Sequence, residues 1–268
     1  MQIPNIRLNN QQRGISLIDL LIGLFIGLLV VTAAISSVVF TRSAQVTQSD
    51  SARLQQQASL VMRLIGLQLK QAGAVEIRNS LDGAVIFDNQ FTGVNGVQDV
   101  IVSGTDGGGT APDTLNVSAQ DQQGVVIVGQ PVTSTVRDCL GNAADLVGVR
   151  MQNTFAVNLP QNSLICTGSN AASGPQAIAV NVENFQVRYG LATFVGLQQQ
   201  IQYVDTVPDF ATAFIRSVQV CLVLRGEQTK NAGGGTVVTG CNNNAIPADG
   251  RIRRVFTNTF YLRNSART

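Results

Sequence analysis

The sequence has no histidine and only two lysines, and charged residues make up just 13% of its 268 residues. Without histidine it lacks the usual general base of enzymes and cannot build a Cys/His zinc site. No nucleophile elbow or pair of catalytic acids stands out. Its four cysteines include no C-x-x-C pair, the usual spacing in a four-cysteine zinc site. We therefore expect no catalytic residues, no metal, no cofactor and no enzyme activity.

The charges are nearly balanced, with 18 Lys and Arg against 16 Asp and Glu, for a net charge of +2. We therefore expect no broad basic surface and no direct binding to nucleic acid. The one basic run, Arg251, Arg253 and Arg254, is expected to line the solvent face of the last strand or its turn. Low charge with abundant Gly, Asn, Gln, Ser and Thr is typical of a β-rich extracytoplasmic protein.

The N-terminal part holds a long apolar run. Residues 17–40 carry one charge in 24 residues, enough to cross a hydrocarbon layer of about 30 Å at roughly 1.5 Å per residue. The preceding segment holds Arg7 and Arg13 and no acid, which favours a cytoplasmic location for that end. The residues after the run should then lie outside the cytoplasm.

The order of parts at this end differs from that of an ordinary secretion signal. Such a signal is cleaved after its apolar stretch, whereas here the plausible processing point, Gly14, comes before it. A cut there would leave the apolar segment on the mature protein, with Ile15 as the new N-terminus. It would also remove two of the 18 basic residues, leaving 16 basic and 16 acidic side chains.

The single acid of the apolar run is Asp19. A carboxylate in a membrane-spanning helix costs at least about 2.5 kcal/mol and usually marks function. In a bundle of such helices, Asp19 of one chain can neutralise the α-amine of Ile15 in the next, which would set their axial register. The alternative is a solvated acid in the first helical turn, where it interacts favourably with the helix dipole.

The helical pattern continues beyond the apolar run, with small or apolar residues at the spacing of one helix face. These are Leu54, Ala58, Val61, Ile65, Leu69 and Ala72. We expect the other, polar face to carry Asp50, Arg53, Gln56, Arg63 and Lys70. Gly73 is a suitable helix stop. The second half of this helix should therefore be amphipathic and pack on another layer.

The rest of the chain is expected to form strands separated by turns rich in Gly and Asn. The predicted strands are 84–87, 114–118, 124–128, 146–151, 177–182, 185–189, 217–224 and 253–262. A long helix followed only by strands indicates an α+β fold. In it, a helix with a membrane-spanning first half and an amphipathic second half packs on an antiparallel β-sheet with disulfide-bearing loops.

In an oxidising compartment the four cysteines are expected to form two disulfides. Three pairings are possible, and the sequence alone does not distinguish them. We favour the local pairs, Cys139 with Cys166 and Cys221 with Cys241, because each closes a loop rich in Asn and Gly.

The N-terminal segment 14–20, GISLIDL, resembles the class III signal of type IV pilins and pseudopilins. Segments 112–117, 184–190, 216–220 with Arg225, and 251–264 narrow the resemblance to minor pilins of the PilW type. The resemblance implies that a prepilin peptidase cuts after Gly14 and that the amine of Ile15 is methylated. Two residues depart from the family pattern: Ile15 replaces Phe at the first mature position, and Asp19 replaces Glu at the fifth.

The resemblance also implies a domain organisation. It consists of a leader, 1–14, which is removed, a transmembrane and assembly segment, 15–40, an amphipathic half-helix, 41–73, and an extracytoplasmic β-rich pilin domain, 74–268.

The implied function is that of a minor pilin which takes part in initiating or assembling a type IV pilus. Its partners would be other minor and major pilins, the prepilin peptidase and the inner-membrane assembly platform. It would begin as a single-pass inner-membrane protein with a periplasmic C-terminal domain and then enter the pilus fibre or its tip. The alternatives are a pseudopilin of a type II secretion system and a membrane-tethered adhesin or binding module.

Overall fold

The structure is a computed structural model. It describes residue 14 and residues 16–79, 85–88, 101–120, 136–143, 150–169, 173–195, 198–209, 213–229 and 234–264. The leader residues 1–13, Ile15 and the predicted strand 124–128 lie outside the described residues. The chain divides into two units, Met1–Val46 and Thr47–Thr268, which are described separately.

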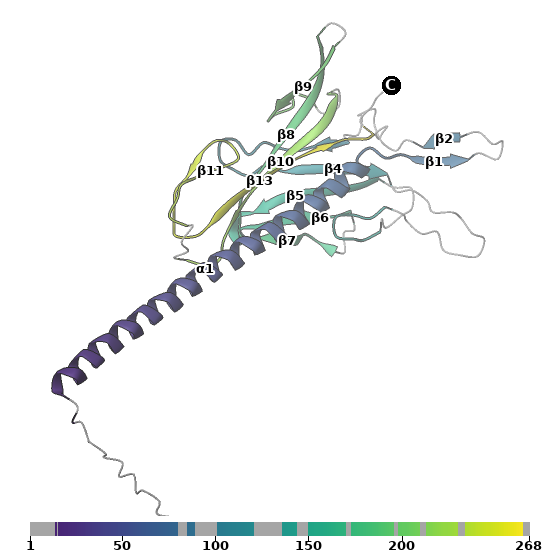
Figure 1. Ribbon diagram of the computed structural model, residues 1–268. Helices are drawn as coiled ribbons and strands as arrows, with labels where there is room; N and C mark the ends of the chain where they lie inside the picture. The colour runs from purple at the N-terminus through teal and green to yellow at the C-terminus, as the bar shows by residue number, and fades with distance from the viewer. Residues whose placement is uncertain are drawn as a thin grey trace, which may run out of the picture. The chain divides into compact units, whose positions relative to one another are not determined.

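One long helix, α1 (Leu17–Gln71), has residues in both units (Figure 1). No proline interrupts it, so its hydrogen-bonding pattern continues for 55 residues. It ends where the sequence predicted, since Gly73 adopts a left-handed φ of 71°. The N–H of Gly73 donates to the carbonyl of Ser118 at 2.9 Å, which joins the helix end to a strand.

In the second unit, four strands between residues 182 and 261 form an antiparallel sheet. Its order is β13 (Arg253–Tyr261), β10 (Ile215–Arg225), β8 (Val182–Val195) and β9 (Gln198–Val204). Residues of β10 alternate across the sheet, so that Val218, Val220 and Leu222 are buried on one face. The predicted strands 217–224 and 253–262 are thus confirmed.

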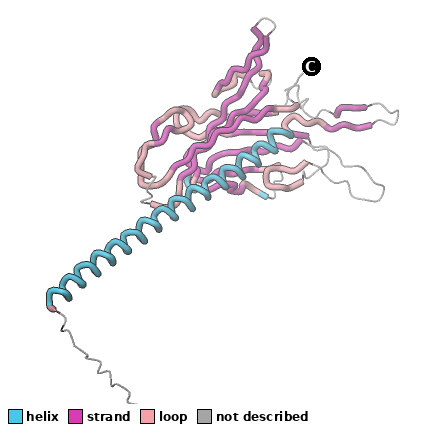
Figure 2. Tube along the Cα trace, in the orientation of Figure 1, coloured by secondary structure: helices cyan, strands magenta, loops and turns pink. Residues whose placement is uncertain are grey.

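A second, five-stranded antiparallel sheet lies in the same unit (Figure 2). Its order is β3 (Val102–Ser103), β4 (Leu115–Gln120), β5 (Arg150–Asn158), β6 (Ser163–Thr167) and β7 (Gln176–Val180). A short 3-10 helix, η1 (Leu159–Gln161), connects β5 to β6. The predicted antiparallel arrangement is therefore confirmed, although the fold has two main sheets rather than one.

Two small hairpins complete the described strands. They are β1 (Glu76–Asn79) with β2 (Val85–Asp88), and β11 (Val238–Thr239) with β12 (Ala245–Ile246).

The chain passes from the five-stranded to the four-stranded sheet at Asn181. This residue has a φ of 55°, a conformation that Asn tolerates better than most residues. Its carbonyl accepts the N–H of Arg225 at 2.9 Å, and the next N–H, that of Val182, donates to Asn162. The two sheets are therefore fixed to each other by backbone hydrogen bonds.

The core of the second unit lies between α1 and both sheets (Figure 1). All six residues of the predicted apolar face of the helix are buried, from Leu54 to Ala72. They meet buried side chains of both sheets, among them Phe155 on β5 and Phe185 on β8. The prediction for Asp50 was wrong, because this acid is only 6% exposed rather than part of the polar face. Its partner explains why, as described below.

Candidate functional site

The predicted processing and assembly residues lie at the beginning of α1. Gly14 is exposed and precedes the helix, whereas Ile15 lies outside the described residues. The carbonyl of Ser16 accepts the N–H groups of Asp19 at 3.0 Å and Leu20 at 3.3 Å, which begins the helix. Asp19 therefore lies in the first turn, at the positive end of the helix dipole, and its side chain is exposed.

The first-unit part of α1 presents apolar side chains on all sides. Residues 17–40 are all exposed, and Leu17, Phe25 and Phe40 have 78%, 61% and 75% of their surface accessible. Among the described residues, α1 is the one helix long and apolar enough to cross a membrane. An apolar surface of this extent requires a lipid or protein environment.

Four of the hydroxyl groups in this part of α1 donate hydrogen bonds within the helix. Thr32 donates to the carbonyl of Leu29 at 2.9 Å, and Ser36 donates to that of Thr32 at 2.8 Å. Thr41 and Ser43 donate in the same way to carbonyls three or four residues earlier. These side chains can therefore enter an apolar environment without leaving an unpaired hydroxyl.

In the second unit, polar contacts fix the helix near its entry to the sheets. Oδ1 of Asp50 accepts the backbone N–H of Glu227 at 3.3 Å, which explains why this acid faces inward. Arg53 forms an ion pair with the carboxylate of Glu227. One turn later, Gln57 donates to the carbonyl of Val180 at 2.6 Å. Together these contacts determine the position of α1 along the strands.

Near the other end of α1, a chain of side-chain amides crosses the core. Gln68, 6% exposed, donates to the carbonyl of Arg137 at 3.2 Å and accepts the side-chain N–H of Asn153 at 2.9 Å. Oδ1 of Asn153 in turn accepts the backbone N–H of Cys139 at 2.8 Å. Sequence reasoning missed both amides, because a buried Gln or Asn looks like a surface residue in a hydrophobicity pattern.

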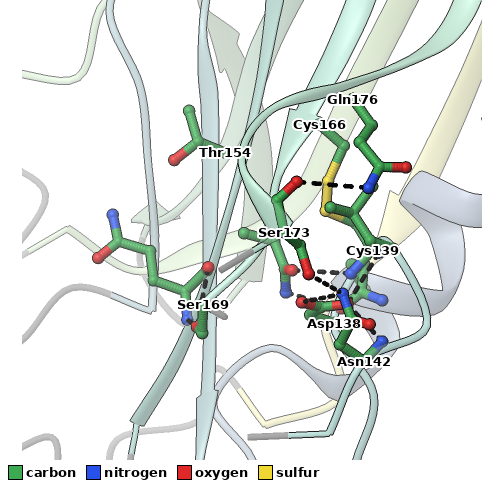
Figure 3. Close-up of a disulfide and its surroundings, with 12 residues drawn as sticks. Asp138, Cys139, Asn142, Thr154, Cys166, Ser169, Ser173 and Gln176 are labelled. Atoms are coloured by element: carbon green, nitrogen blue, oxygen red, sulfur yellow. Dashed lines mark hydrogen bonds between the residues drawn. A yellow bond between two sulfur atoms is a disulfide. The ribbon is translucent and has the colours of Figure 1, made fainter. Parts of the chain in front are cut away.

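Cys139 is bonded to Cys166 on β6, with their Cα atoms 6.4 Å apart (Figure 3). The turn around Cys139 is organised by the buried carboxylate of Asp138, whose Oδ1 accepts the N–H groups of Leu140 at 2.9 Å and Asn142 at 2.8 Å. This disulfide thus ties the Asp138 turn to the five-stranded sheet. It is one of the two local pairs favoured from the sequence.

The second disulfide joins Cys221 on β10 to Cys241, with their Cα atoms 5.8 Å apart. This is the other favoured local pair. The neighbouring Asn242 donates its side-chain N–H to Oε1 of Gln186 at 3.0 Å and also to the carbonyl of Gly109. The segment that carries Cys241 is therefore connected both to β8 and to the glycine-rich turn 104–109.

That glycine-rich turn is held by Asp113. Oδ1 of Asp113 accepts the N–H of Gly107 at 2.9 Å, and Oδ2 accepts the N–H of Val187 at 2.7 Å. Burial raises the pKa of Asp113 even though both hydrogen bonds lower it, and the nearby charges of Asp106 and Asp205 add to the rise. Within the described ranges, no group of three or more acids or cysteines is arranged to hold a metal ion.

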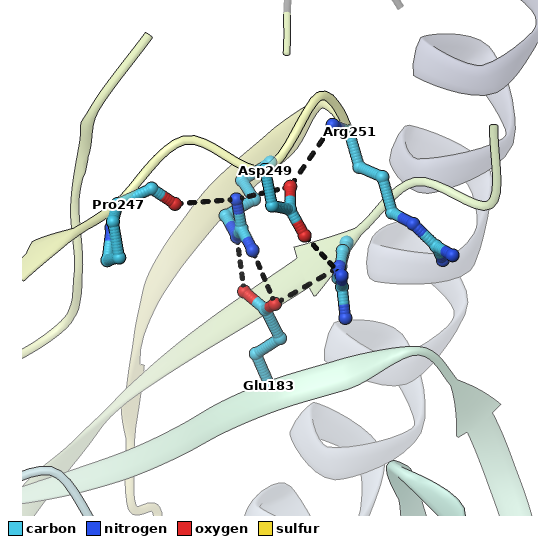
Figure 4. A network of polar contacts seen from close by, with 6 residues as sticks. Glu183, Pro247, Asp249 and Arg251 are labelled. Atoms are coloured by element: carbon cyan, nitrogen blue, oxygen red, sulfur yellow. Dashed lines mark hydrogen bonds and ion pairs between the residues drawn. The ribbon is translucent and has the colours of Figure 1, made fainter. Parts of the chain in front are cut away.

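The basic run near the C-terminus lies beside a polar network that includes Glu183, Asp249 and Arg251 (Figure 4). The side chain of Arg253, only 6% exposed, makes bonds of 2.6 and 3.0 Å to Glu183 and of 2.8 Å to Asp249. Arg225 pairs with the same two acids. The prediction that this run lines the solvent face was thus wrong for Arg253, whereas Arg254 is exposed.

The electrostatics of this network favour its charged form. Hydrogen bonding to Glu183 raises the pKa of Arg253 against the opposing effect of burial. Burial raises the pKa of Asp249, but its hydrogen bonds to Arg251 and Arg253 and the nearby positive charges outweigh this, and its pKa is lowered. The network therefore joins the ends of β8, β10 and β13 by ion pairs.

Comparison with known proteins finds similarity mainly in the C-terminal part of the chain. Residues 147–264, which span β5 to β13, match the family of type IV pilus-assembly protein W. Among solved structures, a type IV-like pilin from Thermus thermophilus is similar at 16% identity, over 80% of this chain and 100% of that one, with a TM-score of 0.44. No curated protein matches the sequence.

The long helix with its apolar first part, the antiparallel sheets and the family match, which covers less than half of the chain, agree with the expected resemblance to type IV pilins. Residues 147–264 are similar to the PilW family, as the C-terminal motifs indicated. A function related to type IV pili follows from this match.

Proposed function

We propose that this protein is a minor pilin that takes part in initiating or assembling a type IV pilus. The observation that carries the proposal is the match of residues 147–264 to a family of pilus-assembly proteins. The protein would be inserted in the inner membrane through residues 15–40, with the domain 74–268 in the periplasm. It would then enter the fibre or its tip together with other minor and major pilins.

The apolar part of α1 supports this proposal. Its side chains are exposed over 17–40, and the hydroxyls of Thr32 and Ser36 donate to the helix backbone. Such a segment is suited both to lipid and to a bundle of like helices. Gly23 and Gly27 have no atom within 4 Å of a Cβ built on them, which leaves room for close approach by a neighbouring helix.

In this proposal, a prepilin peptidase removes the leader by cutting after Gly14, and the amine of Ile15 is then methylated. The resulting amine and Asp19 are separated by only four residues along one chain. In a bundle displaced by about one turn, Asp19 of one subunit pairs with the amine of its neighbour. A misaligned subunit would leave both charges unpaired in apolar surroundings, which is costly.

The proposal is tested by deletion of the gene and by the N-terminal sequence of the mature protein. The expected results are loss of piliation and of twitching motility with secretion intact, restoration by the full-length chain, and a mature chain that begins at Ile15. Loss of secretion with normal pili would instead identify a pseudopilin. An adhesin would leave pilus number unchanged and reduce only attachment. A mature chain that begins at Met1, or beyond residue 40, would contradict the processing step.

A further inference from the structure

Helix α1 and strand β13 enclose an open groove of about 910 Å³ in the second unit. One wall is the helix from Ala58 to Lys70, and the other is β13 from Val255 to Phe260. The two walls touch where the ring of Phe260 packs over Gly66, since a Cβ on Gly66 would lie 2.6 Å from that ring. The two elements that frame the groove are therefore packed against each other at Gly66 and Phe260.

Strand β13 ends the order of its sheet in the part of the chain that the structure describes. The N–H of Leu262 donates to the carbonyl of Arg216, which places the even-numbered residues of β13 in the hydrogen-bonded pairs with β10. The backbone groups of Val255, Thr257, Thr259 and Tyr261 consequently point away from β10. The N–H of Thr259 accordingly donates to the side chain of Asn258 at 2.9 Å rather than to β10.

The charges and apolar groups of the groove define what it can bind. Arg63 and Lys70 line it, both exposed, and no acid is among the described residues of its lining. Among the described residues, neither cation has an ion-pair partner. Between them lies Leu67, 48% exposed, and β13 adds the partly buried Val255 and Phe256. Basic and apolar side chains therefore alternate along the helix wall of the groove, opposite the outer edge of β13.

We infer that this groove binds an extended segment of a partner protein, which adds as a strand to β13 and directs acidic side chains at Arg63 and Lys70. Backbone hydrogen bonds to the outward groups of β13 would supply affinity, and the two cations and Leu67 would select alternating acidic and apolar side chains. The open edge from Val255 to Tyr261 covers seven residues, about 23 Å at 3.3 Å per residue. A segment of about seven residues therefore fits it.

This inference goes beyond the proposed function and depends only on the groove. A full-length chain that fails to support pilus formation would still bind such a segment. Conversely, a chain with a defective groove would still be processed at Gly14.

The test uses the full-length chain in detergent and a labelled eight-residue peptide that alternates valine with glutamate. A peptide with lysine in place of glutamate is the control for charge. Fluorescence anisotropy should show saturable binding of the glutamate peptide and much weaker binding of the lysine peptide. Amide hydrogen exchange should then slow at Thr257 and Tyr261, because their N–H groups point away from β10 and would pair with the added strand. Binding of both peptides alike, or of neither, overturns the inference.

Variants separate the two parts of the recognition. Arg63→Gln with Lys70→Gln should weaken binding about 3- to 10-fold, the size of two exposed ion pairs. Arg63→Glu should shift the preference toward the lysine peptide. Thr257→Pro removes an outward N–H without touching a bond to β10, and should reduce binding at least about 10-fold. Arg251→Gln, which lies outside the groove, is the matched control and should bind normally.

Two outcomes point to other occupants and overturn the inference. Slow exchange at Thr257 and Tyr261 without peptide, at all protein concentrations, means that another segment of the same chain covers the edge. Slow exchange that appears only as concentration rises means that a second copy covers it. Normal binding by Thr257→Pro, with its fold verified by circular dichroism, means that the peptide does not add as a strand.

Discussion

Asn153 on β5 donates its side-chain N–H to Oε1 of Gln68 on α1 at 2.9 Å, across 85 residues of sequence. Both side chains are buried, and Oδ1 of Asn153 also accepts the backbone N–H of Cys139. The helix, the five-stranded sheet and the first disulfide therefore share one polar contact chain. Such a chain is stable only while each of its members has a partner.

We predict that Asn153→Leu destabilises the protein by about 2–4 kcal/mol, because it leaves both the Cys139 N–H and Oε1 of Gln68 buried and unpaired. The measurement is the midpoint of urea unfolding, followed by circular dichroism on the full-length chain. Gln152→Leu is the matched control, since it changes the exposed neighbour on the same strand. Equal effects of the two substitutions would contradict the role of the amide chain.

A second prediction concerns the close packing of α1 on β13. Gly66→Ala should gain up to about 1 kcal/mol from helix propensity but lose about 1–3 kcal/mol from overpacking, because its Cβ would lie 2.6 Å from the Phe260 ring. We expect net destabilisation in the native background. With Phe260→Leu already present, the same Gly66→Ala change should instead stabilise the protein. Thermal unfolding of the four combinations measures this reversal, and an unchanged sign would show that the ring is not the obstacle.

The fold was most predictable from the sequence where one apolar face is continuous. The stripe from Leu54 to Ala72 and the alternation in β10 each have a clear period, and both are buried as predicted. Asp50 and Gln68 interrupt the helical pattern, because each faces inward to bind backbone or side-chain groups from distant segments. Those partners are visible only in the folded chain.

Strands with polar sequences were missed for the same physical reason. In β5, Asn153 occupies a buried position between Met151 and Phe155, so the expected apolar alternation is broken. Strand β9 is rich in glutamine and lies at the edge of its sheet, where most of its side chains are exposed and need not be apolar. At the candidate assembly site, sequence reasoning placed Asp19 near the beginning of the helix. Its pairing remains a prediction, because it depends on a second subunit.

A third prediction concerns pH. Because the pKa of Asp113 is raised in the folded protein, the folded state binds a proton more readily than the unfolded chain, where the pKa is near 3.8. Protonation therefore favours folding as the pH falls through the raised value. The stability of the native protein relative to Asp113→Asn should increase when the pH is lowered from 7 toward 4.

Urea unfolding midpoints of both proteins across this range test the pH effect. Asp106→Asn is the comparison variant, because Asp106 is one of the negative charges that raise the pKa of Asp113. In Asp106→Asn, the gain in stability on lowering the pH should be smaller than in the native protein but still present. A difference between native protein and Asp113→Asn that is constant with pH, or that shrinks on acidification, would refute the assigned direction.

The last prediction separates the two roles open to Asp19. If Asp19 only stabilises the first turn of α1, its removal costs about 0.3–1 kcal/mol of helix stability and leaves assembly nearly normal. If it pairs with the amine of a neighbouring subunit, Asp19→Ala and Asp19→Asn should both abolish assembly, since each leaves an unpaired amine in apolar surroundings. Asp19→Glu, which keeps the charge, should assemble. Membrane fractionation and N-terminal sequencing must show that all three variants insert and are cleaved after Gly14, and counts of pili then decide between the roles. Normal pilus numbers in Asp19→Ala would eliminate the pairing, because an uncharged side chain cannot neutralise the neighbouring amine.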